Sequence, residues 1–145
     1  MIKHWNERWF AMCDLVALWS EDRSTTVGAV IVDDRQNLLS VGWNGLPRKI
    51  QSIESRHQRP EKYQWFEHAE RNAIYNAAAC GMHLLDSTLY INATPCMDCA
   101  RGIIQSGISM VLMKKKVFKG YSEEDLNKGL SMLNEAGIVT NIFKD

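Results

Sequence analysis

The sequence lacks a net charge, because 17 lysines and arginines offset 17 aspartates and glutamates. It therefore has no basic excess of the kind that draws proteins to polyanions, which argues against a nucleic-acid polymer as a partner. It also lacks any apolar run long enough to span a membrane, and its charged start, MIKHWNERWF, has no apolar core such as a signal peptide requires. We therefore expect a soluble, cytoplasmic protein with no membrane partner.

Internal repeats, low-complexity segments and the signature of disorder are also missing. Hydrophobic residues make up 46% of the chain and charged residues 23%, which is ordinary globular usage. A chain of 145 residues can bury a core of its own without disulfides. We expect residues 1–145 to form a single domain.

Cysteine is scarce, with Cys13, Cys80, Cys96 and Cys99 making up the whole set. Without an export signal, metal binding or free thiols are expected rather than disulfides. Two of the four form a C-x-x-C pair, which redox motifs and zinc sites both use. The pair therefore leaves both chemistries open.

Hydrophobic periodicity predicts helices that alternate with strands. It indicates an amphipathic helix over the first twenty or so residues and an antiparallel hairpin from Val27–Asp33 and Leu38–Trp43. Three more helices are expected, each followed by a strand: from near His68, from about Cys96 to Gln105 and from about Ser122 to Glu135.

This alternation of helices and strands implies right-handed crossovers and a mainly parallel sheet with helices on both faces. We predict an α/β fold, a three-layer α/β/α sandwich on a five-stranded mixed sheet with an antiparallel edge hairpin. The first strand is expected to form the antiparallel edge of this sheet.

The stretch from Gly45 to Trp65 is polar and irregular, with two prolines and five basic side chains. Most such stretches are surface loops that only connect two elements. A lid over a functional site is the alternative, and the sequence leaves both open.

The position of the C-x-x-C pair at a helix start favours metal binding. Because Cys96 and Cys99 differ by three positions on a helix, their side chains share a face and can hold one ion. Pro95 suits a helix start, where the helix dipole lowers thiol pKa values and favours metal binding. His68 opens another helix of the same sheet, so the two helix starts can meet at the carboxyl ends of the strands.

Together, His68, Cys96 and Cys99 offer three zinc ligands and leave a fourth position for water, which is typical of a catalytic zinc site. Glu70, two residues beyond the histidine, can then carry a proton between that water and a substrate. Each residue alone has an ordinary explanation, such as a core histidine or a first-turn carboxylate. The pattern H-A-E followed by P-C-M-D-C matches the signature of zinc-dependent deaminases.

More of the chain resembles one group of these enzymes, the deoxycytidylate (dCMP) deaminases of the cytidine deaminase superfamily. WSEDRSTTVGAVIV is similar to their D-P-S-T-x-V-G-A, and GWNGLPR is similar to G-Y-N-G-F-P-R. EHAERNAI resembles C-H-A-E-x-N-A-I, and TPCMDCARGIIQSGI resembles F-P-C-N-E-C-A-K-x-I-I-Q-A-G-I. The resemblance covers nearly the whole chain and implies the cytidine deaminase-like fold.

The resemblance implies hydrolytic deamination of dCMP to dUMP with release of ammonia. Position by position, His68, Cys96 and Cys99 match the family's zinc ligands, and Glu70 matches its proton carrier. Further implied or candidate substrate contacts are Asn44 at the sugar and base edge, the backbone of Ala69 at the pyrimidine, Thr94 in the pocket wall, and Tyr121.

Family members are usually homo-oligomers that dCTP activates and dTTP inhibits. The resemblance therefore implies a dimer or hexamer. It also implies a regulatory nucleotide site at Gly42, Trp43 and Gly45, where magnesium would accompany the triphosphate.

The residues themselves suggest where a 5′-phosphate could bind. A phosphate prefers cationic side chains and backbone N–H donors. Arg23, Ser24 and Thr25, together with the basic stretch after Gly45, can offer both. Arg23 stands where the family usually has proline, and Trp43, Glu67 and Thr94 replace a tyrosine, a cysteine and a phenylalanine.

Three alternatives stay open. A tRNA adenosine deaminase shares H-A-E and GWN, but usually reads P-C-x-M-C-A-G-A where this chain has Asp98 and Arg101 around Cys99. A deaminase of bases or nucleosides is the second alternative. The third is a non-catalytic, zinc-stabilised nucleotide sensor, in which Glu70 would have no purpose.

Overall fold

The computed structural model describes residues 4–116 and 120–144, so the remaining residues of the predicted single domain lie outside the description. The order of elements along the chain is α1 (Trp5–Ala17), β1 (Gly28–Val32), β2 (Leu38–Trp43), α2 (Glu54–His57), α3 (Lys62–Trp65), α4 (Ala69–Ala79), β3 (Thr88–Ile91), α5 (Met97–Gln105), β4 (Met110–Lys114), α6 (Glu123–Glu135) and β5 (Val139–Phe143). The predicted alternation of helices and strands is confirmed.

The five strands form one mixed sheet in the order β2-β1-β3-β4-β5. β1 pairs antiparallel with both β2 and β3, whereas β3, β4 and β5 run parallel. The antiparallel hairpin therefore lies at one edge of the sheet, as predicted. The prediction that the first strand forms this edge is wrong, since β2 is the outer strand and β1 lies between β2 and β3.

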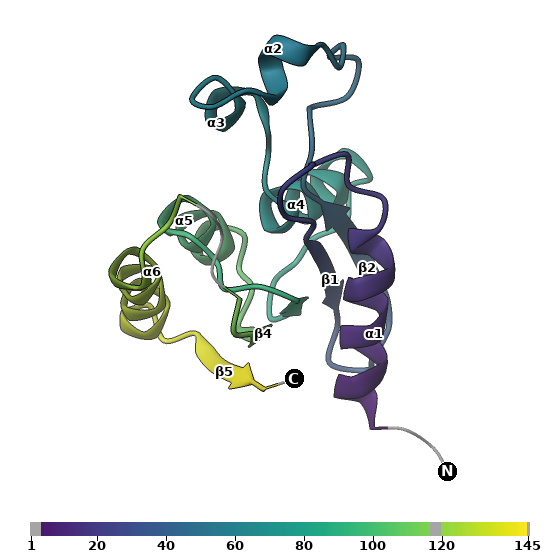
Figure 1. The fold of residues 1–145 in the computed structure, drawn as a ribbon. Coiled ribbons are helices and arrows are strands. Elements are labelled where there is room, and N and C mark those ends of the chain that lie inside the picture. Colours follow the sequence, from purple (N-terminus) through teal and green to yellow (C-terminus); the bar gives the residue numbers. More distant parts are fainter. Residues whose placement is uncertain (1–3, 117–119, 145) are drawn as a thin grey trace.

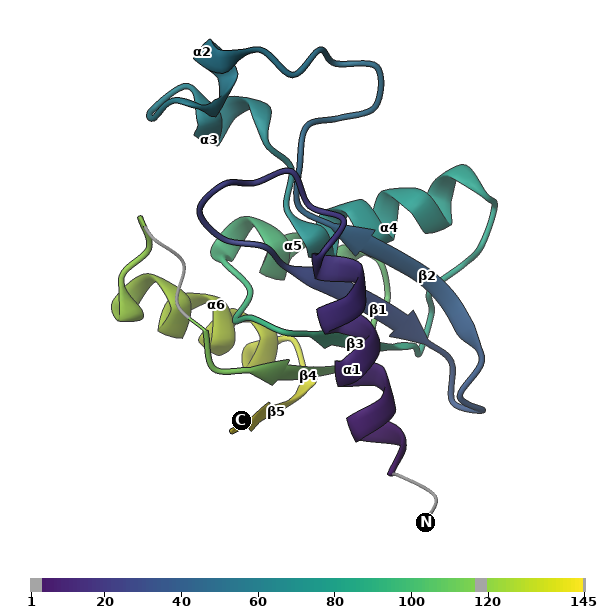
Figure 2. The ribbon, with the colours of Figure 1, turned by 45° about the vertical axis from the view of Figure 1, so that its right-hand side comes forward.

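The two faces of the sheet carry different helices, which gives the predicted three layers (Figures 1 and 2). Alternation along the strands divides the core, because successive side chains point to opposite faces. On one face, Val30 and Tyr90 pack with Phe10 and Cys13 of α1. The other face packs against α4, α5 and α6 in a larger core; this core includes Ala29, Ile31, Leu89, Ile91, Ala73, Ala100, Ile103 and Leu133.

Between β2 and α4 the chain leaves the body of the molecule. Residues 46–66, here called the lid, begin and end at a two-way backbone bridge: the Gly45 N–H donates to the Glu67 carbonyl at 3.1 Å, and the Glu67 N–H donates to the Gly45 carbonyl at 2.8 Å. Both ribbon views show α2 and α3 of the lid standing away from the sheet (Figures 1 and 2). The stretch that the sequence leaves as a loop or a lid thus contains two short helices.

The helices that the structure describes include none that is both long and apolar enough to cross a membrane.

Candidate active site and metal centre

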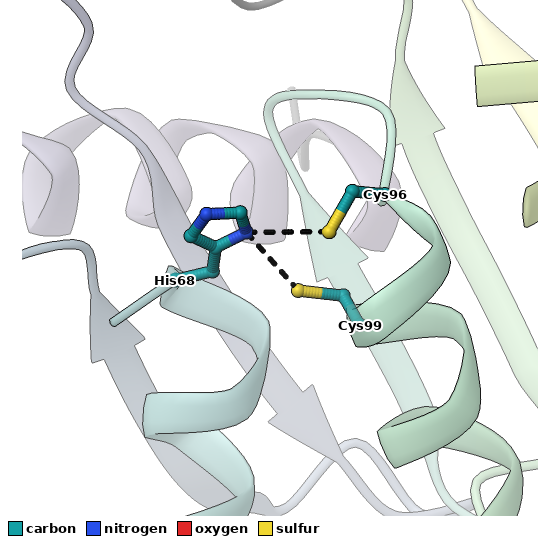
Figure 3. Close-up of side chains that lie close together, drawn as sticks. All are labelled: His68, Cys96 and Cys99. Atoms are coloured by element: carbon teal, nitrogen blue, oxygen red, sulfur yellow. Dashed lines mark hydrogen bonds between the residues drawn. The ribbon is translucent and has the colours of Figure 1, made fainter. Parts of the chain in front are cut away.

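Two helices begin next to each other with unusual residues at their N-caps. His68 caps α4 and Cys96 caps α5, and neither side chain makes a capping hydrogen bond. Serine, threonine, aspartate and asparagine are the usual residues there, because their side chains accept from the first backbone N–H groups. Local rules tend to be broken at functional sites. Here both N-cap side chains turn toward each other instead of toward their own helices (Figure 3).

Three donor atoms converge between these helix starts. His68 Nδ1 lies 3.4 Å from the Sγ of Cys96 and 3.4 Å from the Sγ of Cys99 (Figure 3). The donor atoms of all three residues lie within 4.8 Å of one another. Cys99 is the third residue of α5, so the C-x-x-C spacing places both sulfurs on the side that faces α4.

The chemistry of this donor set fits zinc, which prefers imidazole nitrogen and thiolate sulfur. A hydrogen bond from Cys99 and the neighbouring His68 lower the pKa of Cys96 to about 4, so a thiolate is available near neutral pH. Burial raises the pKa of Cys99. A bound cation would favour ionisation of this second thiol, because a coordinating thiol loses its proton.

Glu70 lies in the first turn of α4 and is only 1% exposed. Its Oε2 is buried and has no hydrogen-bond partner among the described residues. Burial raises the pKa of Glu70, with the nearby Cys96 adding to the shift and His68 opposing it. A buried carboxyl with an unused oxygen beside a metal-binding set has the properties of a general acid and base.

Charged side chains tie the two helix starts together. Arg71 Nη2 lies 2.7 Å from Glu67 Oε1, just before the histidine, and Arg71 Nη1 lies 3.8 Å from Asp98 Oδ2, between the two cysteines. Asp98 also pairs with Arg101. This chain of alternating charges spans the gap between α4 and α5 beside the three donors.

A cleft opens at this end of the sheet, and part of its wall is formed by His68, Ala69 and Glu70. Of the other predicted substrate residues, Thr25, Asn44 and Tyr121 also line it, and the ring centroid of Tyr121 lies 6.1 Å from that of His68. The cleft is also lined by Asp22, Val27, Tyr63, Phe66 and Glu67, which were not predicted, and by Arg59 and Lys62, which were predicted only as members of a basic stretch. Asp22 could have been predicted, because it lies in the stretch WSEDRSTTVGA that resembles the family.

Three predicted substrate residues do not line the cleft. The Arg23 guanidinium, which is largely exposed, pairs with Glu54 of the lid at 2.9 Å. The Ser24 hydroxyl accepts from Arg59 Nη2 at 3.2 Å. Thr94 is buried, and its hydroxyl donates to the Lys114 carbonyl at 3.4 Å. Arg23 thus pairs outside the cleft, whereas Arg59 and Lys62 line it.

A second hollow lies on the other side of the bridge and includes two of the predicted regulatory residues. Trp43 and Gly45 line it, as do Glu21, Leu46, Arg48, Asn72 and Asn76. Gly42 does not line it. A Cβ on Gly42 would lie 2.3 Å from the Ala73 nitrogen, so this glycine allows β2 to pack closely against α4.

A histidine and two cysteines at helix starts, with a buried glutamate beside them, form the arrangement found in zinc-dependent deaminases. Residues 3–115 match the family model described as the cytidine and deoxycytidylate deaminase zinc-binding region. Because this match covers most of the chain, the protein belongs to the cytidine and deoxycytidylate deaminase family, and it is a hydrolytic deaminase with a zinc site. The recognition made from the sequence is confirmed.

Known proteins resemble the chain over almost its full length. It is 36% identical to an "uncharacterized deaminase in luxG 3′ region" of Aliivibrio fischeri over 95% of this chain and 92% of that protein. It is 28% identical to the deoxycytidylate deaminase of Homo sapiens over 96% of this chain and 79% of that protein. The structure of dCMP deaminase from the cyanophage S-TIM5, in complex with dCMP and dUMP, shares the fold with a TM-score of 0.81 at 24% identity over 99% of each chain.

Proposed function

We propose that the protein deaminates dCMP to dUMP by hydrolysis and releases ammonia. One observation carries the proposal: a buried glutamate with an unused oxygen stands beside three converging zinc donors. This glutamate and His68 line a cleft that cationic lid side chains also line. The likeness to deoxycytidylate deaminases supports dCMP as the substrate. Two lid cations in the cleft, Arg59 and Lys62, agree with a substrate that carries a phosphate.

His68, Cys96 and Cys99 are the proposed zinc ligands. Zinc bound there would act as a Lewis acid that makes water nucleophilic near neutral pH. Glu70 takes a proton from the attacking water at its free oxygen and passes it to the ring nitrogen N3 of the pyrimidine, and the second proton of that water goes to the departing amino group. Water supplies the oxygen of the uracil product, and the amino group leaves as ammonia. The raised pKa of Glu70 suits this exchange, because a general base works best when its pKa lies close to the operating pH.

The remaining cleft residues are proposed to hold the nucleotide. Asn44 meets the sugar and base edge, the backbone of Ala69 meets the pyrimidine, and Tyr121 closes the cleft beside His68. For the phosphate, the cleft offers Arg59, and it also offers Lys62, which is paired with Asp22 at 2.7 Å. The predicted contacts of Arg23, Ser24 and Thr94 with the substrate would need these side chains to move from their present partners.

The decisive experiment compares substrates directly. The zinc-loaded protein is incubated in parallel with dCMP, CMP, dCTP, deoxycytidine, cytosine and guanine, and with a tRNA, and ammonia release is measured. We expect dCMP to be turned over with the highest kcat/KM. A higher value for a free base, a nucleoside or tRNA would refute the proposed substrate, and the absence of turnover on every compound would favour a nucleotide sensor.

Variants of Glu70 test the mechanism. Glu70→Gln keeps the shape of the side chain, so the protein should retain one zinc per chain. Turnover of dCMP should fall by about 10²–10⁴-fold, the usual contribution of a general acid and base. Zinc content is measured on the same sample, and unchanged turnover with full zinc would refute the role of Glu70.

The finer properties that the family resemblance implies are also proposals. Regulation by dCTP and dTTP, with magnesium, would use the hollow at Trp43 and Gly45. Adding either triphosphate to the dCMP assay tests this, with Trp43→Ala as the variant that should lose the response. Assembly into a dimer or hexamer is tested by light scattering, and the cytoplasmic location by cell fractionation.

A further inference from the structure

Asp22 lies in the loop between α1 and β1, and its carboxylate gathers four hydrogen-bond donors. Its Oδ1 accepts from the backbone N–H of Ser24 at 2.8 Å, from the backbone N–H of Thr25 at 3.1 Å and from Nζ of Lys62 at 2.7 Å. Its Oδ2 accepts from Nδ2 of Asn44 at 3.2 Å. Three of these donors therefore converge on Oδ1 and one reaches Oδ2, so both oxygens of the carboxylate are engaged.

Two of the four donors belong to different walls of the cleft. Lys62 belongs to α3 in the lid, whereas Asn44 follows the end of β2 in the body of the molecule. Asp22, Lys62 and Asn44 all line the cleft that contains Glu70. A single side chain therefore joins a residue of the lid to a proposed substrate contact.

The ion pair with Lys62 is the strongest tie between the lid and the loop that contains Asp22. The side chains of Asp22 and Lys62 are only 8% and 9% exposed, whereas those of Glu54 and Arg23, which form another tie, are 66% and 59% exposed. Exposed ion pairs contribute little, but removing one partner of a buried pair leaves an uncompensated charge. The hydrogen bond from Arg59 to Ser24 is also exposed.

Asp22 also helps to fix the orientation of the Asn44 amide. The Asn44 Oδ1 accepts from the Val27 N–H at 2.9 Å, and its Nδ2 donates to the Thr25 carbonyl at 2.8 Å and to Asp22. If the amide flipped, its NH₂ would face the Val27 N–H and its oxygen would face two acceptors. The carboxylate therefore supplies the charged contact that holds the amide in one orientation.

We propose that Asp22 is a positioning residue that couples the lid to substrate binding, because one carboxylate fastens Lys62 and orients Asn44. This role rests on the proposed function of the cleft as a nucleotide site. When the lid is released, Asp22 loses its cationic partner Lys62, and when Asn44 reorients, the carboxylate that holds the lid loses its amide donor.

The test uses the zinc-loaded, full-length protein and three single variants. Asp22→Asn keeps the shape but turns a donor toward Lys62 or Asn44, Lys62→Met removes the tie from the lid side, and Glu54→Gln removes an exposed tie as the matched control. Amide hydrogen exchange across the lid is measured without substrate, and kcat and KM are measured with dCMP.

For Asp22→Asn we expect lid exchange at least tenfold faster, KM at least tenfold higher and kcat within threefold of the wild type. Glu54→Gln should stay within twofold in all three quantities. Lid exchange and KM both within twofold of the wild type for Asp22→Asn would overturn the proposal, and so would faster lid exchange with an unchanged KM.

A double variant tests the route through Asn44. If Asp22 acts through that amide, adding Asp22→Asn to Asn44→Ala should change KM by less than twofold. If the two substitutions instead raise KM by the product of their single effects, Asp22 does not act through Asn44. If either variant fails to fold, Lys62→Met still tests whether Asp22 holds the lid, because Asp22 keeps its other three donors in this variant. Unchanged amide exchange in the lid of Lys62→Met would refute the role of the ion pair. If the wild type does not deaminate dCMP, the proposed function fails, while lid exchange in Asp22→Asn still tests the fastening.

Discussion

Replacing Gly42 with alanine should separate β2 from α4, the helix whose start carries His68 and Glu70. A Cβ built on Gly42 lies 2.3 Å from the Ala73 nitrogen and 2.5 Å from the Ala69 carbonyl oxygen. Both are backbone atoms, so no side-chain rotation can relieve the overlap. Since Cβ atoms essentially never come closer than 3.0 Å to another heavy atom, the two elements must move apart by roughly 0.7 Å.

The expected loss of stability follows from the kind of overlap. Overpacking of a well-filled core costs about 1–3 kcal/mol, and a rigid backbone neighbour places this substitution at the upper end, near about 3 kcal/mol. For a chain of this size, that loss lowers Tm by on the order of 10 °C. Activity should fall as well, by about tenfold or more, because misplacing a catalytic group by about 1 Å can cost about 10²-fold.

Gly102→Ala provides the matched control. Gly102 lies inside α5, and its added Cβ would meet only side-chain atoms, the nearest being Arg71 Cγ at 3.4 Å. Because glycine is a poor helix former, this variant should gain about 0.5–1 kcal/mol. Guanidinium unfolding and turnover of dCMP are measured for both variants. A Gly42→Ala protein with the midpoint and activity of the wild type would refute the argument from close packing.

Three further outcomes are expected. Cys99→Ser should lose zinc and lower Tm, because the metal binds only the folded site, whereas Cys80→Ser, at an exposed cysteine, should keep one zinc per chain. Burial raises the pKa of Asp22, but Lys62 and two backbone N–H groups outweigh it, so the folded pKa lies below the ordinary value of 3.8. The stability that this carboxylate contributes is then present above pH 3.8 and is lost as the pH falls through the folded pKa. The free energies of unfolding of the wild type and Asp22→Asn should therefore converge in acid. A difference between them that stays constant from pH 6 to pH 3 would contradict a lowered pKa of Asp22. Arg59→Ala should raise KM for dCMP several-fold more than KM for deoxycytidine, and equal changes would exclude a phosphate contact.

The elements of the fold could be predicted because their signals are local. The short apolar runs VGAVIVD and LLSVGW are signals that act over a few residues, and so are the serine, glycine and proline residues at the helix ends. The order of strands in the sheet has no such local signal, and the predicted edge position of the first strand was wrong for this reason. Every residue of β1 is buried, so both faces of this strand are covered, but its place between β2 and β3 depends on pairing with segments far along the chain.

The proposed zinc ligands and Glu70 could be identified from the sequence because their spacing within each motif is short. The partners of the cations near the cleft could not, since Arg23 and Lys62 carry the same charge and differ only in where they lie. Arg23 pairs with Glu54 on the exposed side, whereas Lys62 reaches Asp22 at the cleft wall. That distinction depends on how a lid of 21 residues folds back over the loop at residues 22–25, and no periodic pattern specifies it.

By itself, the sequence determined the types and order of the elements other than the two short lid helices, the family, and the donor atoms that could hold a metal. Each of these is decided by residues within about one helical turn of each other or by a short motif. Only the tertiary structure decided how closely distant residues approach: His68 Nδ1 lies 3.4 Å from both cysteine sulfurs, and Asp22 contacts Lys62 and Asn44. The physical reason is that such contacts depend on strand order and on the packing of helices across the sheet, which arise from the whole core acting together.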